Sequence, residues 1–165
     1  MEGVITKYFA CQVSDDDLEI YGIERGSCKG QQVLEALAIL IAMRLWHQPG
    51  STKRMQCSVR GDNVGALTLV VKMRPASAQQ AIVARELALL TAQSAFPPSV
   101  THTPGVAHVL ADLLSRMHDS GKDTTQVLEH PALASAIRTH CPPRPRSWYR
   151  ALSEATPLRS AEIVG

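Results

Sequence analysis

Aromatic residues are scarce in this chain of 165 residues: Phe, Tyr and Trp together make up 4% of it. Hydrophobic residues still account for 45%, which is ordinary for a folded globular protein. We therefore expect a core built mainly from aliphatic side chains and Met. The net charge of +2 permits a nucleic-acid partner without arguing for one, because dedicated nucleic-acid binders usually carry a larger basic excess.

Closely spaced cysteine pairs are also missing. The four cysteines are far apart in the sequence and form no Cys-x-x-Cys step: Cys11, Cys28, Cys57 and Cys141. Neither a zinc site nor a disulfide framework is predicted from this spacing. No basic amino-terminal stretch leads into an apolar run, as it would in a secretory signal. We expect a chain that is not secreted and works inside the cell, in the cytoplasm or the nucleus.

No apolar run is long enough to cross a membrane, so we expect no membrane partner. The longest run, Val33 to Trp46, falls short of the roughly 20 residues that a spanning helix needs. Residues 31–46 instead predict a buried central helix, because the segment is apolar on every side. Glu35 is the exception. Either it points outward from the start of the helix, or a cation or hydrogen-bond donors meet it.

The segment before this helix predicts a strand over Glu2–Val13, which is rich in β-branched and aromatic residues. Ser14 then begins a helix, with Asp17 placed to complete a capping box. The three consecutive Asp residues of this helix suit the positive end of the helix dipole. They could also suggest a metal site, although neighbouring residues point in different directions around a helix.

After the central helix, Met55–Arg60 predicts a second strand, and Asp62 lies where this strand gives way to a helix. Functional groups of α/β sheets often occupy this position, although Asp62 could equally cap the helix. A longer amphipathic helix is predicted over 78–94, with Glu86 on its outer face. A short strand over 99–102 follows.

The most specific motif joins this short strand to a final helix. It reads His102-Thr103-Pro104-Gly105 and then Ala111-Asp112-Leu113-Leu114-Ser115-Arg116. Pro104-Gly105 signals a turn, and apolar residues from Val106 onward recur at helical spacing. Asp112 is predicted opposite this apolar stripe, close to the turn. An ordinary solvated helix residue would occupy the same position.

The closing motif resembles the end of the ribonuclease H domain in retroelement reverse transcriptases of the LTR/gypsy or DIRS type, although His108 stands where that family usually has Asn. Further similarity lies in Phe9-Ala10-Cys11, in residues 14–18 and in Glu35-Ala36-Leu37. The resemblance covers roughly residues 2–117. It implies an α/β, ribonuclease H-like fold that lacks the first two strands. The order would be strand, helix, strand, helix, helix, strand and helix, followed by a C-terminal tail.

The resemblance also implies a site. The matching catalytic and metal-binding carboxylates are Glu35, Asp62 and Asp112, and the metal is Mg²⁺ or Mn²⁺. In that family two metal ions activate a water and stabilise the leaving oxygen during attack on a phosphodiester. Glu35 and Asp62 would hold one ion, with Asp112 helping to hold the other. A fourth family carboxylate, an Asp on the first strand, has no counterpart in this sequence.

The two absent strands would form the middle of the family's sheet, whose order is 3-2-1-4-5. Three outcomes are open for the strand predicted at residues 2–13. It pairs beside the Asp62 strand, a partner supplies the missing hairpin, or the domain is unstable. An unpaired strand edge invites association with other chains.

Residues 118–165 are predicted to be a Pro- and Arg-rich C-terminal extension of the domain at 1–117. The extension holds half of the ten prolines. One short helix is predicted from Pro131 to His140. Either the extension packs loosely on the surface, or its arginines and aromatic residues lie along a nucleic-acid backbone.

Three functions are compatible with the sequence. The first is a ribonuclease H-type endonuclease, a hydrolase that cuts RNA in RNA–DNA hybrids beside the polymerase part of a reverse transcriptase, with activity impaired by the missing Asp. The second is a catalytically inactive, truncated or repurposed remnant that binds nucleic acid or a protein. The third is a small helical regulatory module. No small-molecule cofactor is expected, and whether the chain is an enzyme stays open.

Overall fold

A computed structural model describes residues 4–46, 57–93, 98–105, 108–119, 121 and 123–153. In chain order the helices and strands are β1 (Lys7–Tyr8), α1 (Asp15–Tyr21), α2 (Gln31–Trp46), β2 (Ser58–Gly61), α3 (Val64–Lys72), α4 (Ala78–Ala92), β3 (Ser99–His102), α5 (Val109–Ser115), α6 (Thr124–Leu128), β4 (Ile137–Arg138) and α7 (Arg150–Ser153). Three short 3₁₀ helices precede α2, β4 and α7, namely η1 (Cys28–Gly30), η3 (Pro131–Leu133) and η4 (Arg146–Trp148).

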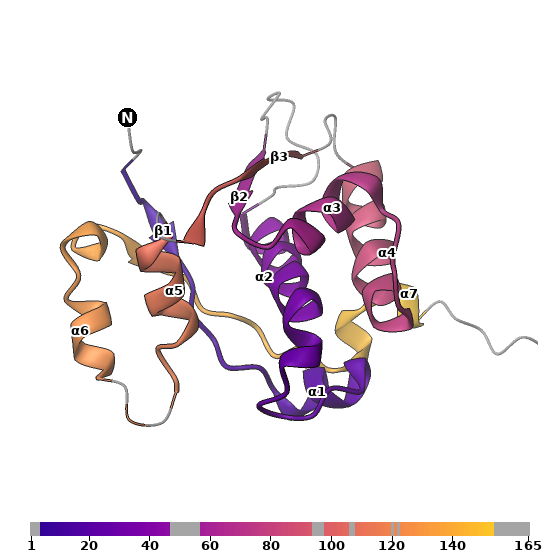
Figure 1. Ribbon diagram of the computed structural model, residues 1–165, viewed down its shortest axis with the longest axis horizontal. Helices are drawn as coiled ribbons and strands as arrows, with labels where there is room; N and C mark the ends of the chain where they lie inside the picture. Colours follow the sequence, from indigo (N-terminus) through magenta and orange to yellow (C-terminus); the bar gives the residue numbers. More distant parts are fainter. Residues whose placement is uncertain are drawn as a thin grey trace, which may run out of the picture.

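The architecture is mixed α/β, with helices and a few short parallel strands (Figure 1). Helix α2 lies in the middle, with α3 and α4 on one side and β1, α5 and α6 on the other (Figure 1). Up to α5, the predicted alternation of strands and helices is found in the predicted order. None of the described helices combines the length and the apolar character needed to cross a membrane.

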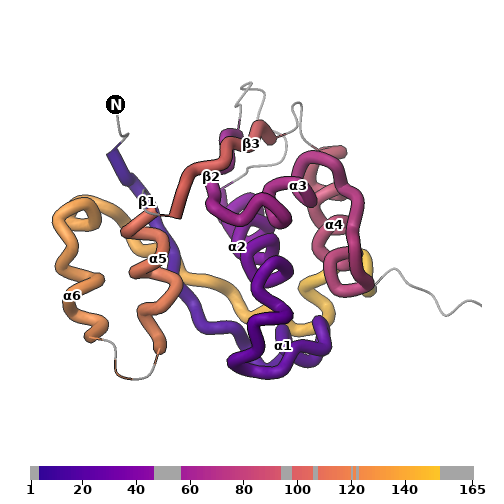
Figure 2. Tube along the Cα trace, in the orientation of Figure 1, coloured from indigo at the N-terminus to yellow at the C-terminus, as the bar shows by residue number. Residues whose placement is uncertain are grey.

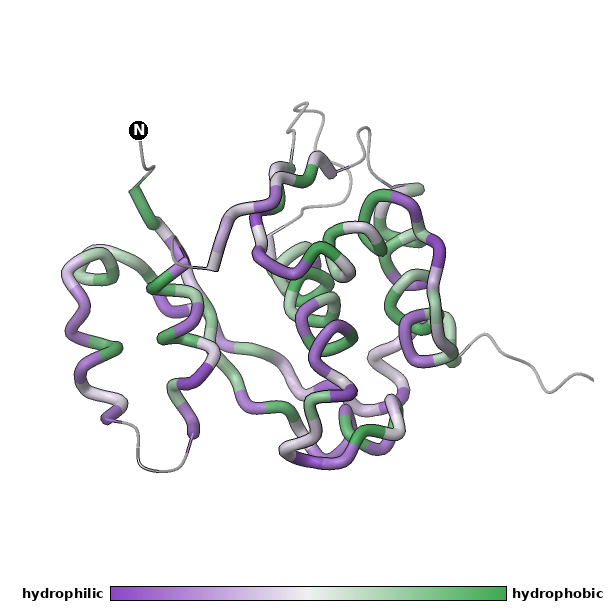
Figure 3. Tube along the Cα trace, in the orientation of Figure 1, coloured by the Kyte–Doolittle hydropathy of each residue, from purple (hydrophilic) through white to green (hydrophobic). Residues whose placement is uncertain are grey.

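Helix α2 is the centre of the core and spans the predicted residues. It packs against both α3 and α4, and hydrophobic positions recur among hydrophilic ones along these helices (Figure 3). Aliphatic side chains dominate the core, as the low aromatic content predicts. The residues of α2 that are buried in it are Val33, Ala36, Leu37, Leu40, Ile41 and Met43.

Two separate parallel pairs of strands form within the described residues. Strand β2 pairs with β3, with Gly61 opposite His102. Strand β1 pairs with β4, with Tyr8 opposite Arg138. Of the three outcomes left open for the amino-terminal strand, pairing beside the Asp62 strand is not found, because β1 pairs with β4 instead. Of the described residues in the predicted strand, only two are regularly paired. Their partner comes from the carboxyl-terminal segment, which runs beside them in the chain trace (Figure 2).

The carboxyl-terminal segment is packed into the protein, so the interpretation of a loose surface extension is wrong for its described part. Tyr149 is completely buried and meets the ring of Tyr21 edge-on, with the ring centroids 5.9 Å apart. The guanidinium of Arg44 stacks over Trp148, 3.8 Å from the ring centroid. The helix predicted from Pro131 to His140 is also wrong, because this stretch forms η3 and then strand β4.

Glu86 of α4 was expected to face solvent, and it is instead fully buried. Its carboxylate pairs with Arg44 of α2 and accepts a hydrogen bond of 2.7 Å from the backbone N–H of Ala151. A buried carboxylate needs such partners to offset its lost hydration. Glu86 therefore fixes the start of α7 against α2 and α4, a role that helical periodicity in α4 does not reveal.

A buried ion pair joins the two ends of the described chain. Ser14 and Asp17 form the predicted capping box at the start of α1. Asp17 is fully buried, and its carboxylate also accepts hydrogen bonds of 2.6 and 3.0 Å from Arg144. The hydroxyl of Tyr149 donates to the same carboxylate at 3.1 Å. Arg144 donates further to the carbonyl of Gln12 at 3.2 Å, so one guanidinium holds both segments together.

We predict that Asp17→Asn lowers the free energy of unfolding by about 3–5 kcal/mol, because it leaves the Arg144 guanidinium buried without its counter-charge. Urea unfolding followed by circular dichroism measures the change. The matched control is Asp15→Asn. Asp15 lies in the same helix as Asp17, and its substitution removes an exposed ion pair with Arg25. It should shift the midpoint little. Equal shifts in the two variants would contradict a stabilising role for the buried pair.

The same carboxylate should make stability depend on pH. Burial alone would raise the pKa of Asp17, but the ion pair with Arg144 and the hydrogen bonds from Ser14 bring it below its ordinary value of 3.8. The unfolded chain therefore binds the proton more readily. The contribution of Asp17 is complete above the ordinary pKa and is lost as the pH falls through the lowered one. Asp17→Asn should accordingly lose less stability than the wild type between about pH 5 and pH 2.

Candidate functional site

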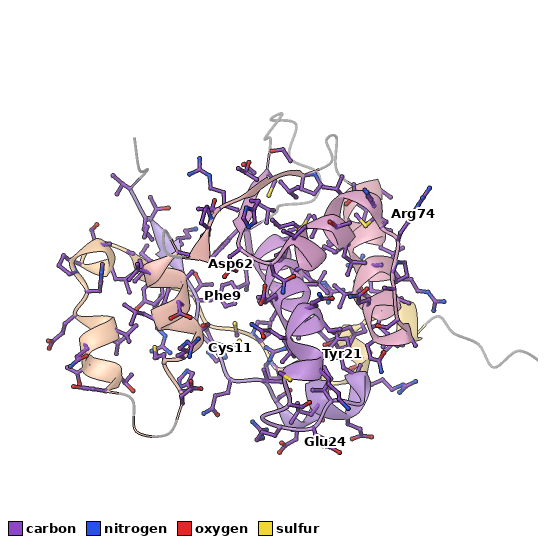
Figure 4. All side chains as sticks on the ribbon, in the orientation of Figure 1. Phe9, Cys11, Tyr21, Glu24, Asp62 and Arg74 are labelled. Carbon is purple, nitrogen blue, oxygen red and sulfur yellow. The ribbon has the colours of Figure 1, made fainter. Side chains whose placement is uncertain are left out.

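A cavity of about 810 Å³ lies between α2, the β2–α3 junction and α5. Its lining includes Glu35 from α2, Asp62 from the junction and Asp112 from α5. Figure 4 shows Asp62 at the end of β2, facing the space between α2 and α5. The structure thus brings all three sequence-predicted carboxylates to one cavity, while their catalytic and metal-binding roles stay predictions. We call this space the acidic cavity.

The β2–β3 pair places Asp62 next to the closing motif. Strand β2 ends at Gly61, whose carbonyl accepts a hydrogen bond of 2.8 Å from the N–H of Thr103. The turn of the motif then passes close to the carboxylate. A side-chain carbon at Gly105 would lie 3.3 Å from Oδ2 of Asp62. The missing side chain at Gly105 therefore leaves the turn free to approach Asp62.

The interpretation of Asp62 as a helix cap is wrong, because Asn63 caps α3. Its side-chain oxygen accepts a hydrogen bond of 3.1 Å from the N–H of Ala66. The side chain of Asn63 also hydrogen-bonds the carboxylate of Glu35. Asn63 thus anchors the helix start and orients Glu35, while the Asp62 side chain stays exposed. Sequence reasoning missed this role, although the Asp-Asn step after a strand was the available signal.

Glu35 is half-buried in the wall of the acidic cavity, so it does not simply point into solvent from the helix start. Burial raises its pKa above the ordinary value, and the negative charge of Asp62 raises it further. Hydrogen bonds from the side chains of Asn63 and Gln31 partly offset these effects. Two carboxylates that repel each other in this way form a place where a cation gains binding energy.

Asp112 forms an ion pair with a residue close by in the sequence. The Nε of Arg116 lies 2.8 Å from Oδ1 of Asp112, one helical turn further on, and both side chains are more than half exposed. Helix α5 is described from Val109, and Val106 lies outside the described residues. The predicted apolar stripe is only partly packed: Val109 is 58% exposed, whereas Met117 is buried.

His108 adds a further polar group to the acidic cavity. It precedes α5 and lines the same wall as Asp112. Its Nε2 atom is buried, and no hydrogen-bond partner for it is present among the described residues. The sequence singled out this position only as a departure from the family pattern.

The donor chemistry of the acidic cavity fits one divalent cation. Mg²⁺ prefers hard oxygen ligands and is often bound through one or two carboxylates, with waters and a substrate phosphate completing its shell. Glu35 and Asp62 form such a pair. Across the described part of the chain, however, no three His, Cys, Asp or Glu side chains are grouped closely enough to hold one metal ion. The pair therefore fits one ion, and the full set of three carboxylates is not assembled.

Cationic side chains stand at the edge of the same cavity. Arg60 on β2 and Arg116 after α5 both line it, and both are exposed. Arginine binds phosphate oxygens through its planar fork of N–H donors. Carboxylates that fit a divalent cation, flanked by arginines, can bind a phosphodiester group.

Comparison with known proteins gives no relatives. No protein-family model matches the chain, and searches of curated proteins and of solved structures give no significant match. The function proposed below accordingly depends on the closing motif and on the geometry of the acidic cavity.

We predict that Mg²⁺ raises the melting temperature of the wild type by roughly 5 °C or more at saturation, because an ion that binds only the folded state stabilises it. Glu35→Gln and Asp62→Asn should each remove most of this increase. Glu19→Gln, on the exposed face of α1, is the control and should keep it.

The increase should also shrink as the pH falls through the raised pKa of Glu35, because a protonated carboxyl group is a poor metal ligand. Differential scanning fluorimetry at several pH values measures both effects. An increase of the same size in all three variants would show that the cation binds elsewhere.

Proposed function

We propose that this chain is a ribonuclease H-like domain of retroelement reverse-transcriptase type, which binds RNA–DNA hybrids at the acidic cavity and hydrolyses their RNA strand at a reduced rate. The observation that carries the proposal is the presence of Glu35, Asp62 and Asp112 in the lining of one cavity, with Glu35 and Asp62 near enough for their charges to interact. They come from three separate elements and line one cavity. The closing motif supports it as well, because its turn lies against Asp62 and its helix carries Asp112.

Each part of the cavity has a role in this proposal. Arg60 and Arg116 bind the phosphate backbone, which supplies affinity but no sequence preference. Glu35 and Asp62 would hold Mg²⁺ or Mn²⁺, which when bound would polarise the phosphodiester and lower the pKa of the attacking water. Asn63 orients Glu35 by a hydrogen bond.

The reduced rate follows from the site as well as from the sequence. The resemblance implies a fourth carboxylate on a first strand, and no residue among 1–165 matches that position. Asp112 is paired with Arg116, which competes with a cation for the same oxygen atoms. Each departure weakens the part of the site that would stabilise the leaving oxygen.

A second candidate is a catalytically inactive remnant that binds nucleic acid. The ion pair between Asp112 and Arg116 favours it, because a surface that presents arginines and keeps one carboxylate neutralised suits phosphate binding without hydrolysis. Both candidates involve the same partner and the same cavity. They differ in whether a phosphodiester bond is broken.

Cleavage of an end-labelled RNA–DNA hybrid by the full chain in Mg²⁺ tests the proposal. We predict slow cleavage of the RNA strand, and we predict that Asp62→Asn abolishes it. The loss should exceed the roughly 10- to 100-fold effect expected for a residue that merely orients a ligand. The control is Asp15→Asn, because Asp15 is exposed on α1 and does not line the acidic cavity. This variant should cleave like the wild type.

Binding of the same hybrid, measured by fluorescence anisotropy in EDTA, separates the two candidates. Tight binding by the wild type without cleavage in Mg²⁺ or Mn²⁺ would support the inactive remnant. Absence of both binding and cleavage would overturn both candidates.

A further inference from the structure

Two cysteines, Cys11 and Cys141, each lie three residues beyond the paired strands β1 and β4, and neither lines the acidic cavity. The register that sets Tyr8 opposite Arg138 continues, because Thr139 donates a hydrogen bond of 2.7 Å to the carbonyl of Tyr8. Extended by three residues beyond the last paired residues of β1 and β4, this register would set Cys11 opposite Cys141. Both line one cavity of about 340 Å³. Figure 4 shows Cys11 on the segment that leads from β1 toward α1.

The spacing of the two segments suits a disulfide. Neighbouring strands lie about 4.8 Å apart. The Cα atoms of bonded cysteines are usually about 4.4–6.8 Å apart. Cys11 and Cys141 line the same cavity, and both residues are free and half-buried. A bond between the two sulfurs therefore needs little movement of the backbone.

Arg144 fixes this arrangement. Its Nη1 donates to Sγ of Cys11 at 3.6 Å and to the carbonyl of Pro142 at 3.5 Å. The guanidinium itself is buried and anchored by Asp17. One rigid cation thus contacts the segments on both sides of the cysteine pair. A nearby positive charge favours the thiolate, which is the reactive form of cysteine.

The two thiols are not equivalent. Burial raises the pKa of Cys141 to about 12, and the hydrogen bond to Cys11 and the negative charge at Cys11 add to the rise. Arg144 contacts the sulfur of Cys11 directly. Cys11, which the guanidinium contacts, is therefore the thiol that we place first in the exchange, and Cys141 is the second.

We propose that Cys11 and Cys141 are a redox-modification site that forms a reversible disulfide by exchange with a low-molecular-weight disulfide of the glutathione class. The Cys11 thiolate attacks one sulfur of the reagent, which gives a mixed disulfide and releases one reduced thiol. Cys141 then loses its proton to solvent, attacks Sγ of Cys11 and expels the second thiol. The two electrons lost by the cysteines reduce one molecule of reagent to two thiols.

The bond would join the amino-terminal segment to the carboxyl-terminal segment across most of the chain. Closing so long a loop restricts the unfolded state strongly. The disulfide would lock the β1–β4 pair, which comprises only two residues on each strand. The oxidised form should therefore resist unfolding more than the reduced form.

Oxidised and reduced glutathione, mixed at defined ratios with the full chain, provide the test. After trapping of free thiols, mass-spectrometric peptide mapping of the wild type should find a peptide pair linked through Cys11 and Cys141. The melting temperature should rise by roughly 10 °C on oxidation and return on reduction. Cys28→Ser is the matched control, because Cys28 is exposed and lies outside the pair, and both results should be unchanged in it.

The single variants test the order of attack. Cys141→Ser should accumulate glutathione on Cys11, because the second thiol is absent. Cys11→Ser should leave Cys141 largely unmodified. The proposal is overturned if the wild-type map shows glutathione on each cysteine separately or links either one to Cys28 or Cys57. It is also overturned if both thiols stay free in fully oxidising buffer. The wild-type map needs no substitution, so its result stands even where a variant folds poorly.

Discussion

The ion pair between Asp17 and Arg144 is the interaction on which the rest of the arrangement depends. It is buried, and a buried charge is tolerated only where opposite charge and hydrogen bonds replace water. The Asp17 carboxylate therefore serves the capping box, the guanidinium and the hydroxyl of Tyr149 together. This one cluster sets the start of α1 and attaches the carboxyl-terminal segment to the helical core.

The strand pairing follows from this attachment. Arg144 holds the carboxyl-terminal segment beside residues 11–12. Strand β4 then lies along β1 and supplies hydrogen-bond partners for the backbone along one edge of β1. Strands β2 and β3 remain a separate pair. Helix α5 then packs mainly on α6 and contains no buried residue in its own span. The acidic cavity lies between that helix and α2, with carboxylates from both.

The cavity shows how the same groups can support two kinds of chemistry. Glu35 and Asp62 repel each other, and Asn63 holds Glu35 in place, which prepares a site for a cation. Asp112 is instead paired with Arg116, the residue that directly follows α5. Under the proposed function, the choice between cleaving nucleic acid and only binding it depends on which partner Asp112 keeps when a phosphate backbone enters.

The sequence by itself determined the features that arise within a few residues of each other. The span and burial of α2, the capping box at Ser14 and the placement of Asp62 after a strand could all be predicted, because periodicity and capping report local interactions. Only the tertiary structure decided the partner of β1, the burial of Glu86 and the meeting of Cys11 with Cys141. Arg144 and Asp17 stand 127 residues apart, and a contact across such a separation leaves no local signal. These pairings depend on the tertiary packing of segments that are far apart in the sequence.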